Sequence, residues 1–162
     1  MIGKKVDNTV ASGGKAGRVF TLSAYIASPE SHDEREKCIL FGAENFLAET
    51  FEGQQAEMLA LAESNTRSPN SIRHYIVSWR AGEVPTEEQV RDAVRTIQRE
   101  MGMDGLQMFY ALHADTENYH LHLMVNRIDP LTEKARDLCG GFDVDGLQRA
   151  VAIIEHEQGW QV

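Results

Sequence analysis

Cysteine is scarce in this 162-residue chain, where Cys38 and Cys139 stand alone and far apart. Neither has a second cysteine at metal-ligand spacing, so we expect structural thiols in a reducing compartment. No apolar run approaches the roughly 20 residues that cross a bilayer, and the first residues lack the apolar stretch of a signal peptide. We therefore expect a protein of the bacterial cytoplasm without membrane insertion.

Basic residues are also in short supply. The chain holds 16 Lys and Arg against 25 Asp and Glu, a net charge of −9 at pH 7. This balance disfavours a nucleic-acid partner, because phosphate binding depends on basic side chains. The charge is uneven, however: residues 28–64 carry nine acids against two bases, whereas residues 64–82 carry three arginines and no acid. A basic binding surface can therefore coexist with an acidic back.

The apolar pattern alternates between helical and strand periods. Predicted helices cover residues 16–27, 54–64, 86–101 and 144–158, and a capping box at Thr86 and Gln89 begins the third. Predicted strands cover residues 38–42, 74–79, 106–112 and 119–128, and the polar turn 114–118 predicts a hairpin of the last two. The segment before residue 16 is expected to be mobile. Because strands and helices intermix without strict βαβ alternation, we predict one α+β domain over residues 1–162. Its architecture would be a two-layer sandwich, a central antiparallel sheet with helices mainly on one face.

Three of the six histidines fall within ten positions around the predicted hairpin. His120 and His122 project to one face of their strand, and His113 ends the preceding strand beside them. Three converging imidazoles with an open coordination position predict a catalytic metal site, with Asp115 and Asn118 of the turn able to orient a ligand. Imidazole alone suits Zn²⁺, Ni²⁺ or copper better than Mg²⁺. The alternative is a pair of surface histidines on an edge strand.

The run from His113 to Asn126, H-x-D-x-x-N-x-H-x-H-x-x-x-N, resembles the third motif of MobA/TraI-type relaxases of the HUH endonuclease superfamily. Residues 65–68 (NTRS) with 74–83 (HYIVSWRAGE) are similar to the second motif of that family, and residues 24–30 (AYIASPE) to the first. The three blocks occur in the family's order. The resemblance spans residues 20–130 and predicts a relaxase domain. Since relaxases are commonly longer, the chain would be the N-terminal part of a longer protein or a compact mobilisation protein.

The resemblance implies a division of labour. Tyr25 would attack the scissile phosphate of single-stranded DNA at an origin of transfer (oriT), giving a covalent 5′-phosphotyrosine and a free 3′-hydroxyl. A divalent ion, Mg²⁺ or Mn²⁺ in this family, would sit at the three histidines and stabilise charge on the phosphate oxygens. Supporting roles fall to Asp115 (activating the nucleophile or holding a ligand), Ser68 (contacting DNA beside the cleaved bond), Asn118 and Asn126 (supporting the histidines).

Several questions stay open at this level. Tyr25 competes as nucleophile with Tyr75, Tyr110 and Tyr119, and His74 is expected only to end a strand. Arg67 and Arg80 are the expected DNA contacts of the basic segment. Relaxosome accessory proteins and the coupling protein of a type IV secretion system are the implied protein partners. The alternatives are another HUH nuclease, namely a rolling-circle initiator or transposase, and a silent DNA-binding module.

Overall fold

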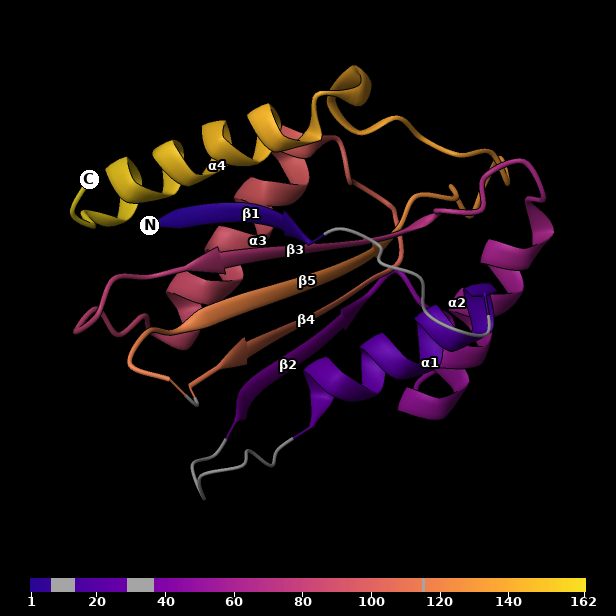
Figure 1. The fold of residues 1–162 in the computed structure, drawn as a ribbon, viewed down its shortest axis with the longest axis horizontal. Coiled ribbons are helices and arrows are strands. Elements are labelled where there is room, and N and C mark those ends of the chain that lie inside the picture. Colours follow the sequence, from indigo (N-terminus) through magenta and orange to yellow (C-terminus); the bar gives the residue numbers. More distant parts are fainter. Residues whose placement is uncertain (7–13, 29–36, 115) are drawn as a thin grey trace.

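A computed structural model describes residues 1–6, 14–28, 37–114 and 116–162 of the chain. Its centre is a five-stranded antiparallel sheet with the order β1-β3-β5-β4-β2 (Figure 1). The strands are β1 (Ile2–Val6), β2 (Cys38–Glu44), β3 (Ile72–Ser78), β4 (Met108–His113) and β5 (His120–Asn126). The helices are α1 (Gly14–Ala27), α2 (Phe51–Ser64), α3 (Glu87–Met101) and α4 (Asp143–Gln158), with a short 3₁₀ helix, η1 (Leu138–Gly141). The predicted α+β class and antiparallel sheet are confirmed. None of the described helices combines the length and apolarity needed to cross a membrane.

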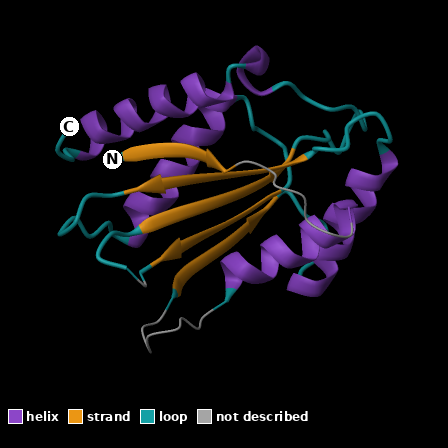
Figure 2. Ribbon diagram, viewed as in Figure 1, coloured by secondary structure: helices purple, strands orange, loops and turns teal. Residues whose placement is uncertain are grey.

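The helices, expected mainly on one face, cover both faces of the sheet. Figure 2 shows them gathered in two pairs around the central strands. One face of β5 presents Leu121, Leu123 and Val125 to a core shared with α3 and α4. The other face is also partly apolar, because Met124 and Phe109 pack there against α1 and α2. This second apolar patch is the reason that a third layer forms, and it places α1 over the histidine side of the sheet.

The strand β1 was not expected, since the segment before residue 16 was predicted to be mobile. Its sequence, IGKKV, has only two large apolar residues, and the strand is defined by antiparallel pairing with β3. Gly3 permits close contact with α4: a Cβ atom at this position would lie 2.9 Å from the Cγ of Leu147. The strand therefore depends on tertiary contacts that a local pattern does not reveal.

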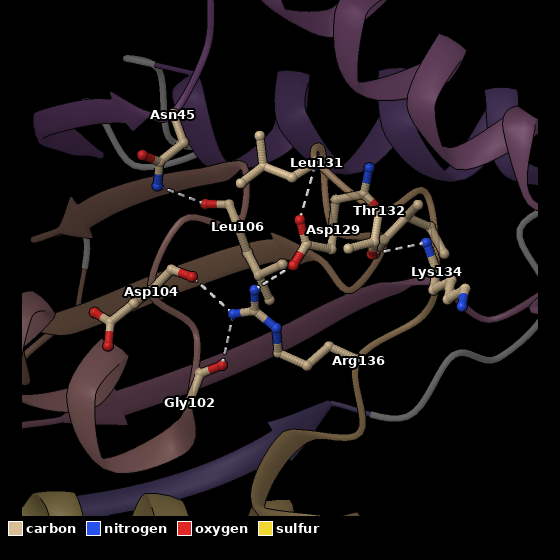
Figure 3. Close-up of polar contacts among 11 residues, drawn as sticks. Asn45, Gly102, Asp104, Leu106, Asp129, Leu131, Thr132, Lys134 and Arg136 are labelled. Atoms are coloured by element: carbon tan, nitrogen blue, oxygen red, sulfur yellow. Dashed lines mark hydrogen bonds and ion pairs between the residues drawn. The ribbon is translucent and has the colours of Figure 1, made fainter.

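The segment between β5 and α4 is held to the core by polar contacts (Figure 3). The guanidinium of Arg136 donates to the carbonyls of Gly102 and Asp104, at 3.0 and 2.7 Å, and pairs with the Asp129 carboxylate at 2.6 Å. These bonds satisfy carbonyl groups just after α3 and anchor the long connection. This connection leads from the end of β5 to α4, which packs against β1.

The helix α1 is fixed in place at both ends. Near its start, the Lys15 ammonium donates to the backbone carbonyls of Ala62 and Asn65, which end α2. Such cationic bonds satisfy carbonyls that have no partner within their own helix. At its other end, the carbonyl of Ile26 accepts a hydrogen bond from His113 of β4 at 2.7 Å. These anchors set the position of Tyr25, which directly precedes Ile26 on the helix.

Candidate active site

The three histidines of the third motif share one face of the sheet. His113 and His120 are directly opposite each other in the β4–β5 pairing, and His122 lies opposite Ala111. The rings of His113 and His122 are 4.1 Å apart between centroids, and both side chains are buried. The predicted hairpin is present, and its register places His113 beside the other two histidines. Antiparallel pairing thus gathers imidazoles that are seven and nine positions apart in sequence.

Tyr25 lies against the two buried histidines. Its ring centroid is 6.0 Å from that of His113 and 6.0 Å from that of His122, in an edge-on arrangement in both cases. The reason is the helical pattern of α1, whose buried residues Leu22 and Ile26 press the helix onto the sheet beside the histidines. Tyr25 nevertheless remains 50% exposed. It is therefore next to the histidines and open to a ligand.

The other tyrosines are occupied elsewhere. Tyr75 and Tyr110 are buried in the core on the opposite face, and Tyr119 packs against that same core. The Tyr75 hydroxyl donates to Asp143, and burial is the main cause that raises the pKa of Tyr75 far above its ordinary value. None of these three rings lies against the histidines. The geometry therefore favours Tyr25 over its three competitors.

Lys37 is part of this site and was missed by the sequence analysis. Its ammonium lies 3.6 Å from the centre of the Tyr25 ring and donates to the Tyr25 carbonyl at 3.1 Å. The side chain is almost fully buried at 8% exposure, and its own carbonyl accepts a hydrogen bond from Ala114 beyond β4. A cation over an aromatic face is attracted by the ring quadrupole. Lys37 thus holds the Tyr25 ring and places a positive charge beside it.

His74, expected only to end a strand, belongs to the histidine cluster. Its Nε2 is 2.9 Å from the Nδ1 of His122, and the two rings stack at 5.2 Å. This contact arises because β3 pairs with β5, with His74 opposite Met124 on the histidine side of the sheet. The sequence signal for this contact was that His74 and Ser78, four positions apart on a strand, lie on the same face of the sheet. Without the β3–β5 register, that spacing does not identify a partner.

Burial keeps His74 and His122 neutral. Loss of solvent is the main cause that lowers the pKa of His74 to about 4, and the charges of Arg18, His113 and Lys4 add to it. Burial likewise lowers the pKa of His122 far below its ordinary value, with smaller contributions from the neighbouring histidines and Lys37. A neutral imidazole retains a nitrogen lone pair, which is the form that binds a metal.

These shifts predict how the stability of the metal-free protein depends on pH. Below about pH 6.5 the unfolded chain protonates its histidines, whereas folded His74 stays neutral down to about pH 4. As the pH is lowered from about 6.5 to about 4, the unfolding free energy should therefore fall, by at most about 1.4 kcal/mol per pH unit for each such histidine. Denaturant titrations in metal-free buffer measure this dependence. His74→Gln should make the decline shallower, and an unchanged slope would contradict the assignment.

His120 makes different contacts from its two neighbours. Its Nδ1 is 2.7 Å from the Ser78 hydroxyl, and its Nε2 is 2.9 Å from the Thr116 hydroxyl. Within the described residues, no group of three or more His, Cys, Asp or Glu side chains is arranged to hold a metal ion. Binding of an ion by His120 would require one of these two hydrogen bonds to be exchanged.

The predicted DNA contacts are divided between the two ends of β3. Arg67 and Ser68 lie in the turn before the strand, with Arg67 exposed and Ser68 half-buried. Arg80 is exposed just beyond Ser78, the residue that pairs with His120. Only Arg80 is therefore near the histidine end of the strand. The roles of these residues in binding DNA stay predictions.

The two predicted supporting asparagines tie elements together. The Asn118 amide donates to the Trp79 carbonyl at 2.7 Å, which fastens the β4–β5 turn to the end of β3. Asn126 is fully buried, and its amide donates to the Met58 carbonyl at 3.3 Å, which joins β5 to α2. Asp115, expected to assist the nucleophile or a ligand, lies outside the described residues.

Three known proteins are similar to this chain in sequence. Protein MobA of Acidithiobacillus ferrooxidans is 47% identical over 104 residues, covering 64% of this chain and 25% of the relative. Two TraI proteins of Escherichia coli are 34% and 36% identical over 110 and 117 residues, covering 67% and 65% of this chain but 14% and 16% of their own lengths. The chain thus spans a quarter or less of these relatives. Residues 25–160 match the family described as relaxase, MobA/VirD2-like, nuclease domain. The resemblance predicted from the three motifs is confirmed, and the chain belongs to the MobA/VirD2-like relaxase nuclease domains.

Proposed function

We propose that this domain nicks and rejoins single-stranded DNA at an oriT, with Tyr25 as the nucleophile. The observation that carries the proposal is a half-exposed tyrosine against two buried histidines, His113 and His122. The phenolic oxygen forms a bond to phosphorus as the bond to the 3′-oxygen breaks. The phenol loses its proton, and the departing 3′-oxygen gains one. Because no water is consumed, the strand can be rejoined by the reverse reaction.

Three imidazoles on one face of the sheet are a donor set that suits a divalent cation. We propose that His113, His120 and His122 hold this ion after His120 exchanges one of its hydrogen bonds to Ser78 and Thr116. A carbonyl can only accept, so His113 donates from Nε2 to Ile26 and would bind the ion through Nδ1. In neutral His122, Nε2 can serve in the same way. Such an ion, Mg²⁺ or Mn²⁺ by family, supplies polarisation of the scissile phosphate when it is bound.

His74 would act as a positioning residue for His122. If Nδ1 of His122 donates to Nε2 of His74, the proton is fixed on Nδ1 and the lone pair on Nε2 remains available. The reverse tautomer would place the proton on Nε2 of His122 and block it. Partners that orient a ligand in this way commonly contribute 10- to 100-fold to metal affinity, which is about what we expect here.

His74→Phe tests this role, because it keeps a flat ring for stacking but removes the acceptor. We expect Mn²⁺ affinity by titration calorimetry to fall about 10- to 100-fold. The ¹⁵N spectrum of the metal-free protein should show His122 shifting away from the Nδ1–H tautomer. His74→Gln, which retains an acceptor oxygen, should restore part of the affinity. Unchanged metal affinity in His74→Phe would rule out the positioning role.

The rest of the relaxase assignment belongs to the same proposal. The exposed Arg67 and Arg80 would bind the DNA backbone, and the charge of the buried Lys37 would attract the strand to Tyr25. Ser68 would contact DNA beside the cleaved bond. Asp115 would help to activate Tyr25 or hold a ligand. The domain would act in the bacterial cytoplasm with relaxosome accessory proteins and a type IV secretion coupling protein.

The proposed reaction is tested with fluorescently labelled single strands that tile the DNA flanking the gene. With Mn²⁺ present, one of them should yield a protein–DNA adduct that survives denaturation, together with a shorter strand ending in a 3′-hydroxyl. Adding an excess of a second strand with a free 3′-hydroxyl at the same junction should release the adduct by joining. Tight binding without an adduct on any strand would instead identify a silent DNA-binding module.

A further inference from the structure

A cavity of about 190 Å³ lies beside the proposed nucleophile. It is lined by Arg18, Thr21, Leu22 and Tyr25, whose spacing of three, four and seven residues puts them on one side of α1. A water molecule takes up roughly 30 Å³ in the liquid, so the cavity has room for a larger group. It is smaller than the roughly 300–1,000 Å³ of pockets for drug-sized ligands. Its size suits one small unit of a longer molecule.

Arg18 brings to this cavity a positive charge that no carboxylate of the described residues compensates. Its Nε and Nη2 atoms are buried and have no hydrogen-bond partner among the described residues. Burial lowers the pKa of the guanidinium, and no carboxylate among those residues offsets that effect. A partly buried cation without an anion is unfavourable, so a ligand that supplies an anion would be stabilised here. Arginine binds phosphate well because its planar fork can donate two parallel hydrogen bonds.

Two basic groups of this acidic chain, Arg18 and Lys37, lie near Tyr25. Arg18 lies seven residues earlier on α1, which is about 10 Å along the helix axis. The Lys37 ammonium lies over the Tyr25 ring. Arg18 also contributes to the lowered pKa of His74, so its charge acts on the histidine cluster. A polyanion that passes over Tyr25 would therefore meet two positive charges near the reacting group.

We propose that this cavity is a subsite for one nucleotide of single-stranded DNA next to the scissile phosphate. Arg18 pairs with the phosphodiester of that nucleotide, and the base packs on Leu22 and the exposed part of the Tyr25 ring. Base contacts of this kind tolerate different sequences, because every base has a flat apolar face. The inference rests on the proposed nicking of single-stranded DNA and names the part of the site that positions the strand.

The test is fluorescence anisotropy with a labelled single-stranded oligonucleotide of mixed sequence, titrated over a range of salt concentrations. Arg18→Gln should weaken binding about tenfold, as expected for one charged hydrogen-bonding contact. It should also lower the slope of log affinity against log salt by about 0.7, the value for one phosphate contact on a single strand. Arg18→Lys should keep the slope while losing part of the affinity. Arg95→Gln on α3 is the matched control, since that arginine is largely exposed and pairs with Asp92.

Thermal unfolding separates a binding role from a structural one. Removing a buried charge that has no partner should leave the melting temperature of Arg18→Gln unchanged or raise it. A lower melting temperature with unchanged DNA affinity would overturn the subsite. Adduct formation in the same samples reports the proposed function separately. A wild-type adduct combined with an unaltered salt slope in Arg18→Gln rejects the subsite alone. A weaker salt slope without any adduct supports a phosphate site and rejects the nicking reaction.

Discussion

His122→Ala is expected to abolish binding of divalent metal. This imidazole is the centre of the cluster, because its ring lies 4.1 Å from that of His113 and its Nδ1 lies 2.9 Å from His74. Without His122, the proposed site loses one of its three ligands, and His113 and His74 lose the imidazole that both of them contact. The loss should exceed the roughly 10- to 100-fold effect expected for His74, which only orients a ligand. Calorimetric titration with Mn²⁺ and Ni²⁺ measures it.

The substitution must leave the domain folded for this comparison. His122 is buried, so alanine leaves a small cavity and takes the hydrogen-bond partner from His74, at a cost of about 1–3 kcal/mol. Far-ultraviolet circular dichroism checks the fold. His156→Ala is the matched control, since that exposed histidine on α4 lies outside the cluster and should bind metal as the wild type does. Wild-type metal affinity in folded His122→Ala would contradict the proposed site.

Tyr25→Phe is expected to remove covalent chemistry while sparing both kinds of binding. The change deletes one oxygen from a ring that is 50% exposed, and the edge-on contacts with His113 and His122 need only the ring. Phenylalanine also keeps the aromatic face under the Lys37 ammonium. Metal affinity, single-strand affinity and melting temperature should stay near wild type. The denaturation-resistant adduct should fall below detection on gels.

Tyr119→Phe gives the control for this prediction. That ring packs against the opposite core, so its variant should form the adduct at the wild-type rate. If Tyr25→Phe forms the adduct and Tyr119→Phe does not, the nucleophile is Tyr119 and the assignment of Tyr25 is wrong. Adducts in single Phe variants at all four tyrosines would reject tyrosine attack altogether.

Local sequence patterns were sufficient where the contacts are local. The hairpin of β4 and β5 joins strands that are close in sequence, so the shared face of His113, His120 and His122 followed from a period of two and a short turn. Tyr25 was chosen by resemblance, and its contact with the histidines agrees with that choice. The capping box at Thr86 was also confirmed, because its hydrogen bonds span only three residues.

Non-local contacts were not predictable in this way. His74 meets His122 only because β3 lies between β1 and β5, an order that no local pattern gives. No local pattern distinguishes Lys37 and Arg18 from other charged residues. Lys37 reaches Tyr25 because the start of β2 lies beside the end of α1, and Arg18 is notable only for the cavity that it lines. The acidic net charge likewise gave no sign that Arg18 and Lys37 lie near Tyr25. Charge counted along a chain therefore says little about the charge around one site.

The most direct test of the central claim is the location of the covalent bond in the wild-type protein. After reaction with a cleavable single strand and Mn²⁺, the adduct would be digested with nuclease and protease and sequenced by mass spectrometry. We predict a phosphonucleotide on Tyr25, in the peptide that contains the end of α1. A nucleotide attached to any other residue, or a free 5′-phosphate with unmodified protein, would contradict the account.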